Sequence, residues 1–132
     1  MPAQTRFSLR RRITSFRYAL AGIRQMVETQ HNAWIHLAAT LLVLVAGGLL
    51  HLSRSEWIAV IVAMALVWSA EAVNTAFEFL CDVTSPEFHP LVEKAKNIAA
   101  AAVLICAIGA ACIGLLIFLP HLLALCHQPL LP

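Results

Sequence analysis

Charged side chains are scarce in this sequence, whereas apolar ones are abundant. Asp, Glu, Lys and Arg make up only 12% of the 132 residues, and apolar residues make up 61%. Typical soluble domains contain about 25% charged and roughly 45–50% apolar residues. A chain this short cannot bury so many apolar side chains in one compact core. We therefore exclude a water-soluble globule and expect a single membrane domain over residues 1–132, with lipid as the solvent for much of its surface.

Three familiar sequence signals are also missing. The four cysteines show no metal-ligand spacing such as C-x₂-C, so we interpret them as packing residues. The N-terminal region lacks a short apolar core followed by a small-residue cleavage site, and a removable signal peptide is not expected. The chain also has no glycine-rich loop of the kind that cradles nucleotide phosphates.

The few basic residues are concentrated near the N-terminus. Six of the nine precede residue 25, namely Arg6, Arg10, Arg11, Arg12, Arg17 and Arg24. A basic arm can bind nucleic acid, but membrane spans follow this one at once. We therefore interpret it as a cytoplasmic anchor at an anionic lipid surface and expect no nucleic-acid partner.

The hydropathy pattern predicts an all-α membrane protein. Residues 5–30 have apolar side chains at broadly helical spacing and predict an amphipathic helix in the membrane interface. Three transmembrane helices of about 20 residues or slightly more are then expected. They cover residues 34–52, 57–81 and 98–119. The polar stretch 53–56 is short, which predicts a tight antiparallel pair of the first two spans.

Prolines mark the expected ends of the third span. Pro120 is expected to end it, leaving a tail over residues 120–132 to which we assign no role. Before this span, Ser85 followed by Pro86 is typical of a helix start. Pro90 complicates such a helix, so a short turn is an equal alternative.

Lysine and arginine also predict the orientation. The basic arm and the loop carrying Lys94 and Lys96 fall on the same side after two crossings, whereas the opposite side has only Arg54. The positive-inside rule then places the N-terminus and this loop in the cytoplasm and the C-terminus outside.

A polar stripe interrupts the second span. Glu71 and Glu78 are two helical turns apart and share a face with Asn74, and Asp82 extends that face by another turn. Carboxylates within a membrane helix are costly and mark a functional site by default. Polar contacts that hold the helices together are the alternative. Because four such residues share one face, we favour a site.

The loop after the stripe adds cations. Lys96 and Lys94 stand close to where the stripe emerges, but Lys94 is better explained as a topological anchor. Lysine is a compact phosphate binder, and clustered carboxylates suit Mg²⁺ together with substrate phosphates. The pattern therefore indicates handling of a phosphate near the lipid headgroups.

Residues 71–103, EAVNTAFEFLCDVTSPEFHPLVEKAKNIAAAAV, resemble the signature of the bacterial integral-membrane diacylglycerol kinase and undecaprenol kinase family. Its pattern is E-x-x-N-[ST]-A-x-E-x-x-x-D, then a loop with His, then A-K-D and a run of small residues. Looser agreement covers residues 5–119. The resemblance implies a homotrimer in the bacterial inner membrane with composite sites between subunits. It also implies transfer of the ATP γ-phosphate, with Mg²⁺, to undecaprenol or diacylglycerol at the inner leaflet.

The same resemblance implies a role for each polar residue. Glu71 would be the general base that takes the proton from the lipid hydroxyl, and Asn74 would orient groups in the site. Glu78 would hold the metal. The nucleotide would be bound by Lys96, Asp82 and Arg11. Because positioning and electrostatics carry most of phosphoryl transfer, so small a set can suffice.

Two positions depart from the family pattern. A-K-D is here Ala95-Lys96-Asn97, and the metal-binding Glu of the arm aligns with Gln30. Glu28 is close in sequence, but two residues of helix turn it away by roughly 160°. Each substitution removes a negative charge, although an amide oxygen still ligates Mg²⁺ more weakly. Three alternatives follow from these departures. Gln30 and Asn97 alter the binding of ATP·Mg²⁺, or the chain is a lipid phosphatase or another ATP-independent lipid-phosphate enzyme, or it is a non-catalytic membrane partner.

The histidines are given lesser roles. His31 and His36 are five residues apart, which is poor spacing for two ligands on one helical face, and we expect both to be interfacial. His89 falls in the loop of the family pattern and is expected to shape it.

Overall fold

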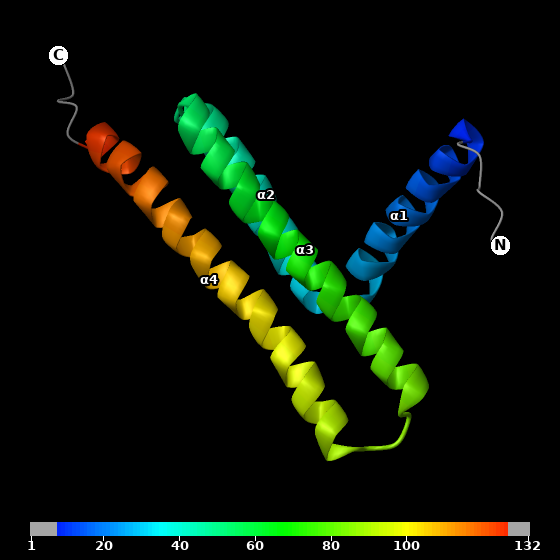
Figure 1. The fold of residues 1–132 in the computed structure, drawn as a ribbon. Helices are drawn as coiled ribbons and strands as arrows, with labels where there is room; N and C mark the ends of the chain where they lie inside the picture. The colour runs from blue at the N-terminus through cyan, green and yellow to red at the C-terminus, as the bar shows by residue number, and fades with distance from the viewer. Residues whose placement is uncertain (1–7, 127–132) are drawn as a thin grey trace, which may run out of the picture.

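The computed structural model describes residues 8–126, which form four helices (Figure 1). The helices are α1 (Leu9–Thr29), α2 (His31–Leu49), α3 (Arg54–Thr84) and α4 (Pro90–Cys126). The last three are long and apolar enough to cross a membrane. The expected all-α protein with three transmembrane helices is confirmed. Predictions for residues 5–7 of the arm and 127–132 of the tail lie outside the described residues.

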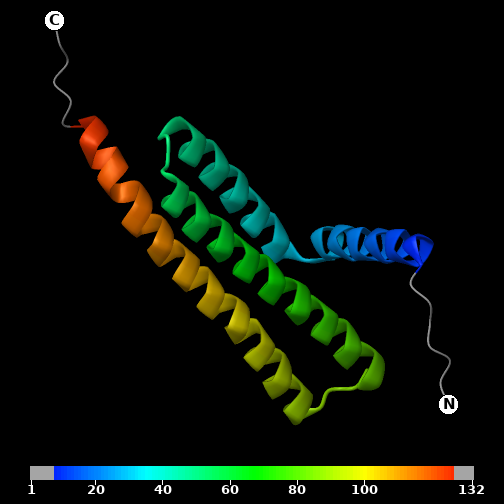
Figure 2. The ribbon, with the colours of Figure 1, turned by 45° about the horizontal axis from the view of Figure 1, so that its top comes forward.

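Helix α1 diverges from the other three helices (Figures 1 and 2). It has an apolar stripe with steps of three and four residues, formed by Leu9, Ile13, Phe16, Leu20 and Ile23. Each of these side chains is more than half exposed, and Met26 is the one residue of α1 that the protein buries. Because no part of the described chain covers the stripe, it suits the membrane interface, with arginines on its flanks.

A single extended residue separates α1 from α2. Gln30 has φ −105° and ψ 120°, and its backbone N–H still donates to the carbonyl of Met26. The helix therefore breaks without losing this hydrogen bond, and α2 begins at His31, earlier than the expected span. The break directs the chain from the divergent α1 into the bundle, and it places the Gln30 side chain beside α3.

The C-terminal end of α2 closes in a Schellman motif. The N–H groups of His51 and Leu52 donate to the carbonyls of Gly48 and Gly47 at 3.4 and 3.2 Å. His51 takes the left-handed conformation that this motif requires, with φ 53°. A Cβ atom on Gly47 would lie 2.8 Å from the Trp57 ring, so glycine permits the close approach of α2 and α3.

Helix α3 starts immediately afterwards with a capping box. The Ser53 hydroxyl accepts from the N–H of Glu56 at 3.4 Å, and the Glu56 carboxylate accepts from the N–H of Ser53 at 2.7 Å. Residues 50–53 suffice to reverse the chain, and α2 and α3 run antiparallel side by side (Figure 2). The tight pair predicted from the short polar stretch is confirmed.

The segment between α3 and α4 decides between a helix start at Ser85 and a short turn. Ser85 ends α3, because its N–H donates to the carbonyl of Cys81 at 2.8 Å. The expectation of a helix start at Ser85 is therefore wrong, and the short turn is correct. Helix α4 begins at Pro90, where the missing N–H would have no partner in the helix. His89 shapes this start, since its Nδ1 accepts from the N–H of Leu91 at 3.2 Å.

Pro120 lies within α4 and does not end it. The helix continues to Cys126, so the expected helix end at residue 119 is wrong. Proline removes one backbone hydrogen bond, but in an apolar solvent leaving the helix would expose many more polar backbone groups. The neighbouring His121 places its Nδ1 2.9 Å from the carbonyl oxygen of Ile117, whereas the carbonyl that loses its helical donor to Pro120 is that of Leu116.

One face of α3 carries most of the buried residues. They recur every three or four positions, at Val60, Ala63, Val67, Glu71 and Asn74. Helix α4 runs antiparallel to α3 along this core, and Val103 is the one residue that α4 buries. The apolar core of the bundle therefore continues directly into the polar stripe.

Candidate active site

Glu71 is a fully buried carboxyl group with no hydrogen-bond partner in residues 8–126. Its side chain has no exposed surface, and both carboxylate oxygens are unpaired. The nearest polar group is His36 of α2, whose Nε2 lies 3.7 Å from Glu71 Oε2. That distance is too long for a hydrogen bond, and Nε2 is also buried and unpaired. The two side chains thus face each other between α2 and α3.

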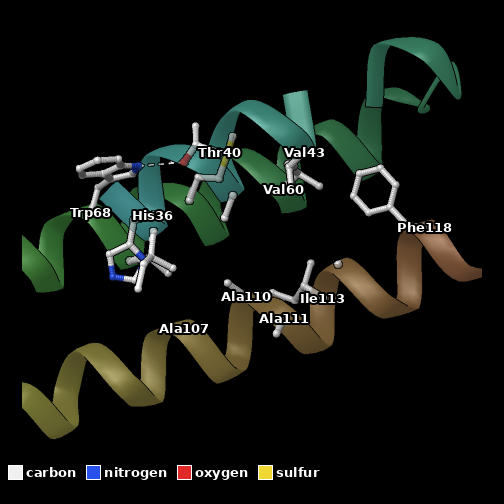
Figure 3. A pocket seen from close by; sticks show the side chains of 15 residues that line it. His36, Thr40, Val43, Val60, Trp68, Ala107, Ala110, Ala111, Ile113 and Phe118 are labelled. Atoms are coloured by element: carbon white, nitrogen blue, oxygen red, sulfur yellow. Dashed lines mark hydrogen bonds between the residues drawn. The ribbon is translucent and has the colours of Figure 1, made fainter. Parts of the chain in front are cut away.

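The His36 ring is held by the neighbouring turn of the helix pair (Figure 3). It meets the indole of Trp68 edge-on, with ring centroids 6.3 Å apart. Trp68 Nε1 donates to the hydroxyl of Thr40 at 3.0 Å, which links α3 to α2. This pair therefore fixes the surface against which His36 packs.

Glu78 gathers two amides, one from its own helix and one from the break before α2. Its Oε1 accepts from Asn74 Nδ2 at 3.2 Å, and its Oε2 accepts from Gln30 Nε2 at 3.1 Å. Glu28 instead bonds Arg24 at 2.7 Å on the exposed surface of α1, where the carboxylate raises the pKa of the arginine. Position 30, and not position 28, therefore lies beside Glu78, and the role of Gln30 as a metal ligand stays a prediction.

The donors around Glu78 fit a hard divalent cation. Glu78 offers a half-buried carboxylate, Gln30 offers an amide, and Asn74 Oδ1 is buried without a partner in the described chain. Mg²⁺ prefers oxygen ligands and commonly takes one or two carboxylates together with substrate phosphates. Residues 8–126 contain no cluster of three His, Cys, Asp or Glu side chains. A cation here would therefore need the amides and a ligand phosphate.

The residues expected to bind the nucleotide meet one turn beyond Glu78. Lys96 Nζ lies 2.7 Å from Asp82 Oδ1, which joins α4 to α3. Both line a pocket of about 360 Å³ at the α3–α4 turn, and Asn97 and His89 line it as well. The structure thus brings Asp82, Lys96 and Asn97 together at one polar opening.

Arg11 is the predicted site residue that the structure keeps apart. It is exposed and lies near the far end of α1, and eighteen residues of helix separate it from Thr29. That length is about 27 Å at the usual rise of about 1.5 Å per residue. Its role in binding a nucleotide stays a prediction.

An apolar pocket of about 300 Å³ lies beside the buried pair, between α2, α3 and α4. Figure 3 shows His36 and Trp68 at one end and Phe118 at the other, with small side chains of α4 along one wall. The wall of α4 includes Ala107, Ala110, Ala111 and Gly114. The pocket thus ends at the histidine that faces Glu71.

Sequence reasoning missed His36. It was expected to be an interfacial residue, but its side chain is only 14% exposed and lies between two helices. The spacing to His31 tests only whether the two act as a ligand pair, so it gave no indication of this burial. The available signal was a titratable side chain inside an otherwise apolar span.

Comparison with known proteins identifies the family of this chain. Residues 17–118 match the sequence model of the prokaryotic diacylglycerol kinase family. The chain is 40% identical over 117 residues to undecaprenol kinase of Bacillus subtilis, covering 89% of this chain and 95% of that protein. It is also 40% identical over 114 residues to a diacylglycerol kinase of Synechocystis, covering 86% and 65% respectively. The chain therefore belongs to the prokaryotic diacylglycerol kinase family and is a lipid kinase.

Proposed function

We propose that the chain transfers the γ-phosphate of ATP to the hydroxyl group of a membrane lipid alcohol, with Mg²⁺ as the cofactor. The observation that carries this proposal is the Glu71 carboxyl group, which is fully buried and unpaired among the described residues. A general base needs an unoccupied oxygen within reach of the hydroxyl proton. Glu71 offers such an oxygen. It lies two helical turns from Glu78, where the phosphate-bound metal would sit.

The length of α3 supports a site that two substrates reach at two different depths in the membrane. Seventeen residues separate Arg54 from Glu71, which corresponds to about 26 Å of helix. With Arg54 at the outer surface, Glu71 lies close to the opposite edge of a hydrocarbon layer roughly 30 Å thick. Asp82 lies about 17 Å further along the helix. A lipid hydroxyl would thus meet Glu71, and ATP would enter from water at the α3–α4 turn.

The reaction is a direct displacement. The lipid oxygen attacks the γ-phosphorus and forms a P–O bond, the bond to the ADP oxygen breaks, and Glu71 takes the hydroxyl proton. Glu78 and Gln30 would hold Mg²⁺, and Asn74 would orient groups beside them. When bound, the metal neutralises charge on the transferring phosphoryl group. Lys96, Asp82, Asn97 and Arg11 would bind the nucleotide.

The proposed setting is the inner leaflet of a bacterial cytoplasmic (inner) membrane, with the N-terminus in the cytoplasm. The distribution of Lys and Arg supports this orientation. A homotrimer with composite sites is part of the proposal. The position of Arg11 supports it, since this arginine is far from the other site residues of its own chain.

Phosphate transfer by the purified protein in lipid micelles tests the proposal. We expect label from γ-labelled ATP·Mg²⁺ in undecaprenol or in diacylglycerol, and none with Glu71→Gln. Undecaprenol is the first lipid to test, because this chain aligns with 95% of the length of the relative named undecaprenol kinase. If well-folded protein transferred no label to either lipid, that result would contradict the proposal. Phosphate release from the two lipid phosphates would then be measured, since Gln30 and Asn97 leave the site less anionic than the family pattern.

A further inference from the structure

Four buried polar atoms lack a hydrogen-bond partner among residues 8–126, and they belong to three neighbouring residues. They are His36 Nε2, Glu71 Oε1, Glu71 Oε2 and Asn74 Oδ1. Buried polar atoms without partners are unfavourable, so a cluster of them in one place calls for an explanation. Roles for Glu71 and Asn74 are already proposed. His36 has none, although its Nε2 is directed at the Glu71 carboxyl group.

Packing leaves His36 little freedom to point elsewhere. The ring lies between α2 and α3, with its side chain 14% exposed, and the Trp68 indole meets it edge-on. Trp68 Nε1 donates to the Thr40 hydroxyl, so the indole N–H already has a partner and is not bonded to the imidazole. The 3.7 Å separation from Glu71 Oε2 closes to a hydrogen bond with a small side-chain movement. Such contacts are often long before substrate arrives.

We propose that His36 is a positioning residue for the kinase reaction, donating from Nε2–H to Glu71 Oε2 and thereby directing Glu71 Oε1 at the lipid hydroxyl. The inference rests on the proposed role of Glu71 as the base. A carboxylate with no fixed hydrogen-bond donor can rotate, so that either of its two equivalent oxygens faces the lipid hydroxyl. One hydrogen bond to Oε2 selects Oε1 for the proton transfer, so His36 acts through Glu71 and forms no bond with the phosphate.

The location of His36 adds a reason for histidine at this position. It lies at the polar end of the apolar pocket, whose other lining residues are apolar apart from Thr40 and the Trp68 indole. For packing alone, leucine would fill this position without an unpaired nitrogen. A histidine at this position is therefore better explained by its approach to Glu71 than by packing.

Four variants of the full-length protein in lipid micelles test the inference. His36→Leu removes the donor and retains an apolar side chain of similar size. His36→Gln places an amide N–H near the position of Nε2, whereas His36→Asn carries its amide one carbon short of it. Thr40→Val breaks the adjacent hydrogen bond to Trp68 and serves as the packing control.

We expect His36→Leu to lower kcat at least tenfold while KM for ATP and for the lipid stays within twofold. His36→Gln should recover kcat to within threefold of the wild type, and His36→Asn should not. Thr40→Val should retain kcat within twofold. Thermal unfolding in the same micelles identifies variants that fail to fold. If His36→Leu does not fold, the comparison of Gln with Asn decides the question.

The outcomes separate this inference from the proposed function. Equal kcat for His36→Leu and wild type would overturn it, as would equal losses in His36→Leu and Thr40→Val, or equal activity of the Gln and Asn variants. A raised lipid KM with unchanged kcat would assign His36 to pocket shape and also overturn it. Full activity of Glu71→Gln would instead refute the role of Glu71, and the positioning role would fail with it.

Discussion

The two ends of the α2–α3 pair differ in how their polar groups are satisfied. At the end with the α2–α3 turn, which is the outer end in the proposed orientation, the Schellman motif and the capping box pair the backbone N–H groups of residues 50–53, and Trp57 packs on Gly47. At the inner end, Glu71 is fully buried and neither of its oxygens has a partner in the described chain. Local hydrogen bonds complete the outer end. In the proposed function, the substrates complete the inner end.

This difference explains why stability and activity should respond to different substitutions. The outer contacts hold two helices at close range without any group from outside the chain. The inner polar groups are kept in place by the same helices, yet their hydrogen-bonding capacity is left open. A change at the outer end should therefore move the unfolding temperature, and a change at the inner end should move catalysis.

The largest expected effect comes from Glu71→Gln, which alters the inner end without changing its shape. Removing a general base typically costs about 10²–10⁴-fold in rate. We expect kcat to fall within that range while thermal unfolding in detergent stays at or above the wild-type temperature, because an amide loses less solvation on burial. A variant that loses stability together with activity would contradict this separation.

Gln30→Glu sharpens the comparison by adding a carboxylate beside Glu78. A second negative charge should strengthen the metal site, and we expect the Mg²⁺ concentration for half-maximal activity to fall about tenfold, or ~1.4 kcal/mol. Without a metal the two carboxylates repel each other, so the unfolding temperature in chelator should fall and recover on addition of Mg²⁺. The same unfolding temperature with and without Mg²⁺ would count against a metal at this position. Glu28→Gln, on the exposed face of α1, is the matched control.

Gly47→Ala tests the outer end. The new methyl group would lie 2.8 Å from the Trp57 ring, and overpacking of this kind typically costs about 1–3 kcal/mol. We expect a lower unfolding temperature with kcat unchanged. Gly48→Ala is the matched control, because a methyl group there meets nothing within 4 Å and should stabilise the helix by up to about 1 kcal/mol. Equal shifts in the two variants would show that the close approach does not matter.

Ser53→Ala should have the smallest effect. It removes the side-chain acceptor that caps α3, a change that typically costs about 1 kcal/mol. We expect an unfolding temperature a few degrees lower and no change in lipid phosphorylation. A loss of activity larger than the loss of folded protein would show that the outer end influences the site.

The sequence predicted those features that depend on a single helix. Hydropathy predicted the three spans, and helical spacing predicted the common face of Glu71, Asn74 and Glu78. These conclusions need only the periodicity of a helix. The predicted roles of the residues in chemistry stay predictions.

Features that depend on contacts between helices were not predictable in the same way. His36 and Glu71 are 35 residues apart, and no spacing rule for one helix connects them. The continuation of α4 through Pro120 depends on lipid surroundings, which a proline rule derived from soluble helices does not include. The Asp82–Lys96 pair likewise requires the reversal of the chain at residues 85–89.

The compact outer turn has a consequence for how the chain enters a membrane. In the proposed orientation, residues 50–56 must cross the hydrocarbon layer during biogenesis, and they include Arg54 and Glu56. The Schellman motif and the capping box already pair the backbone groups that would otherwise cross unpaired. The two helices can therefore be inserted together as one preformed hairpin, so that export of this segment needs no separate passage of an unfolded loop.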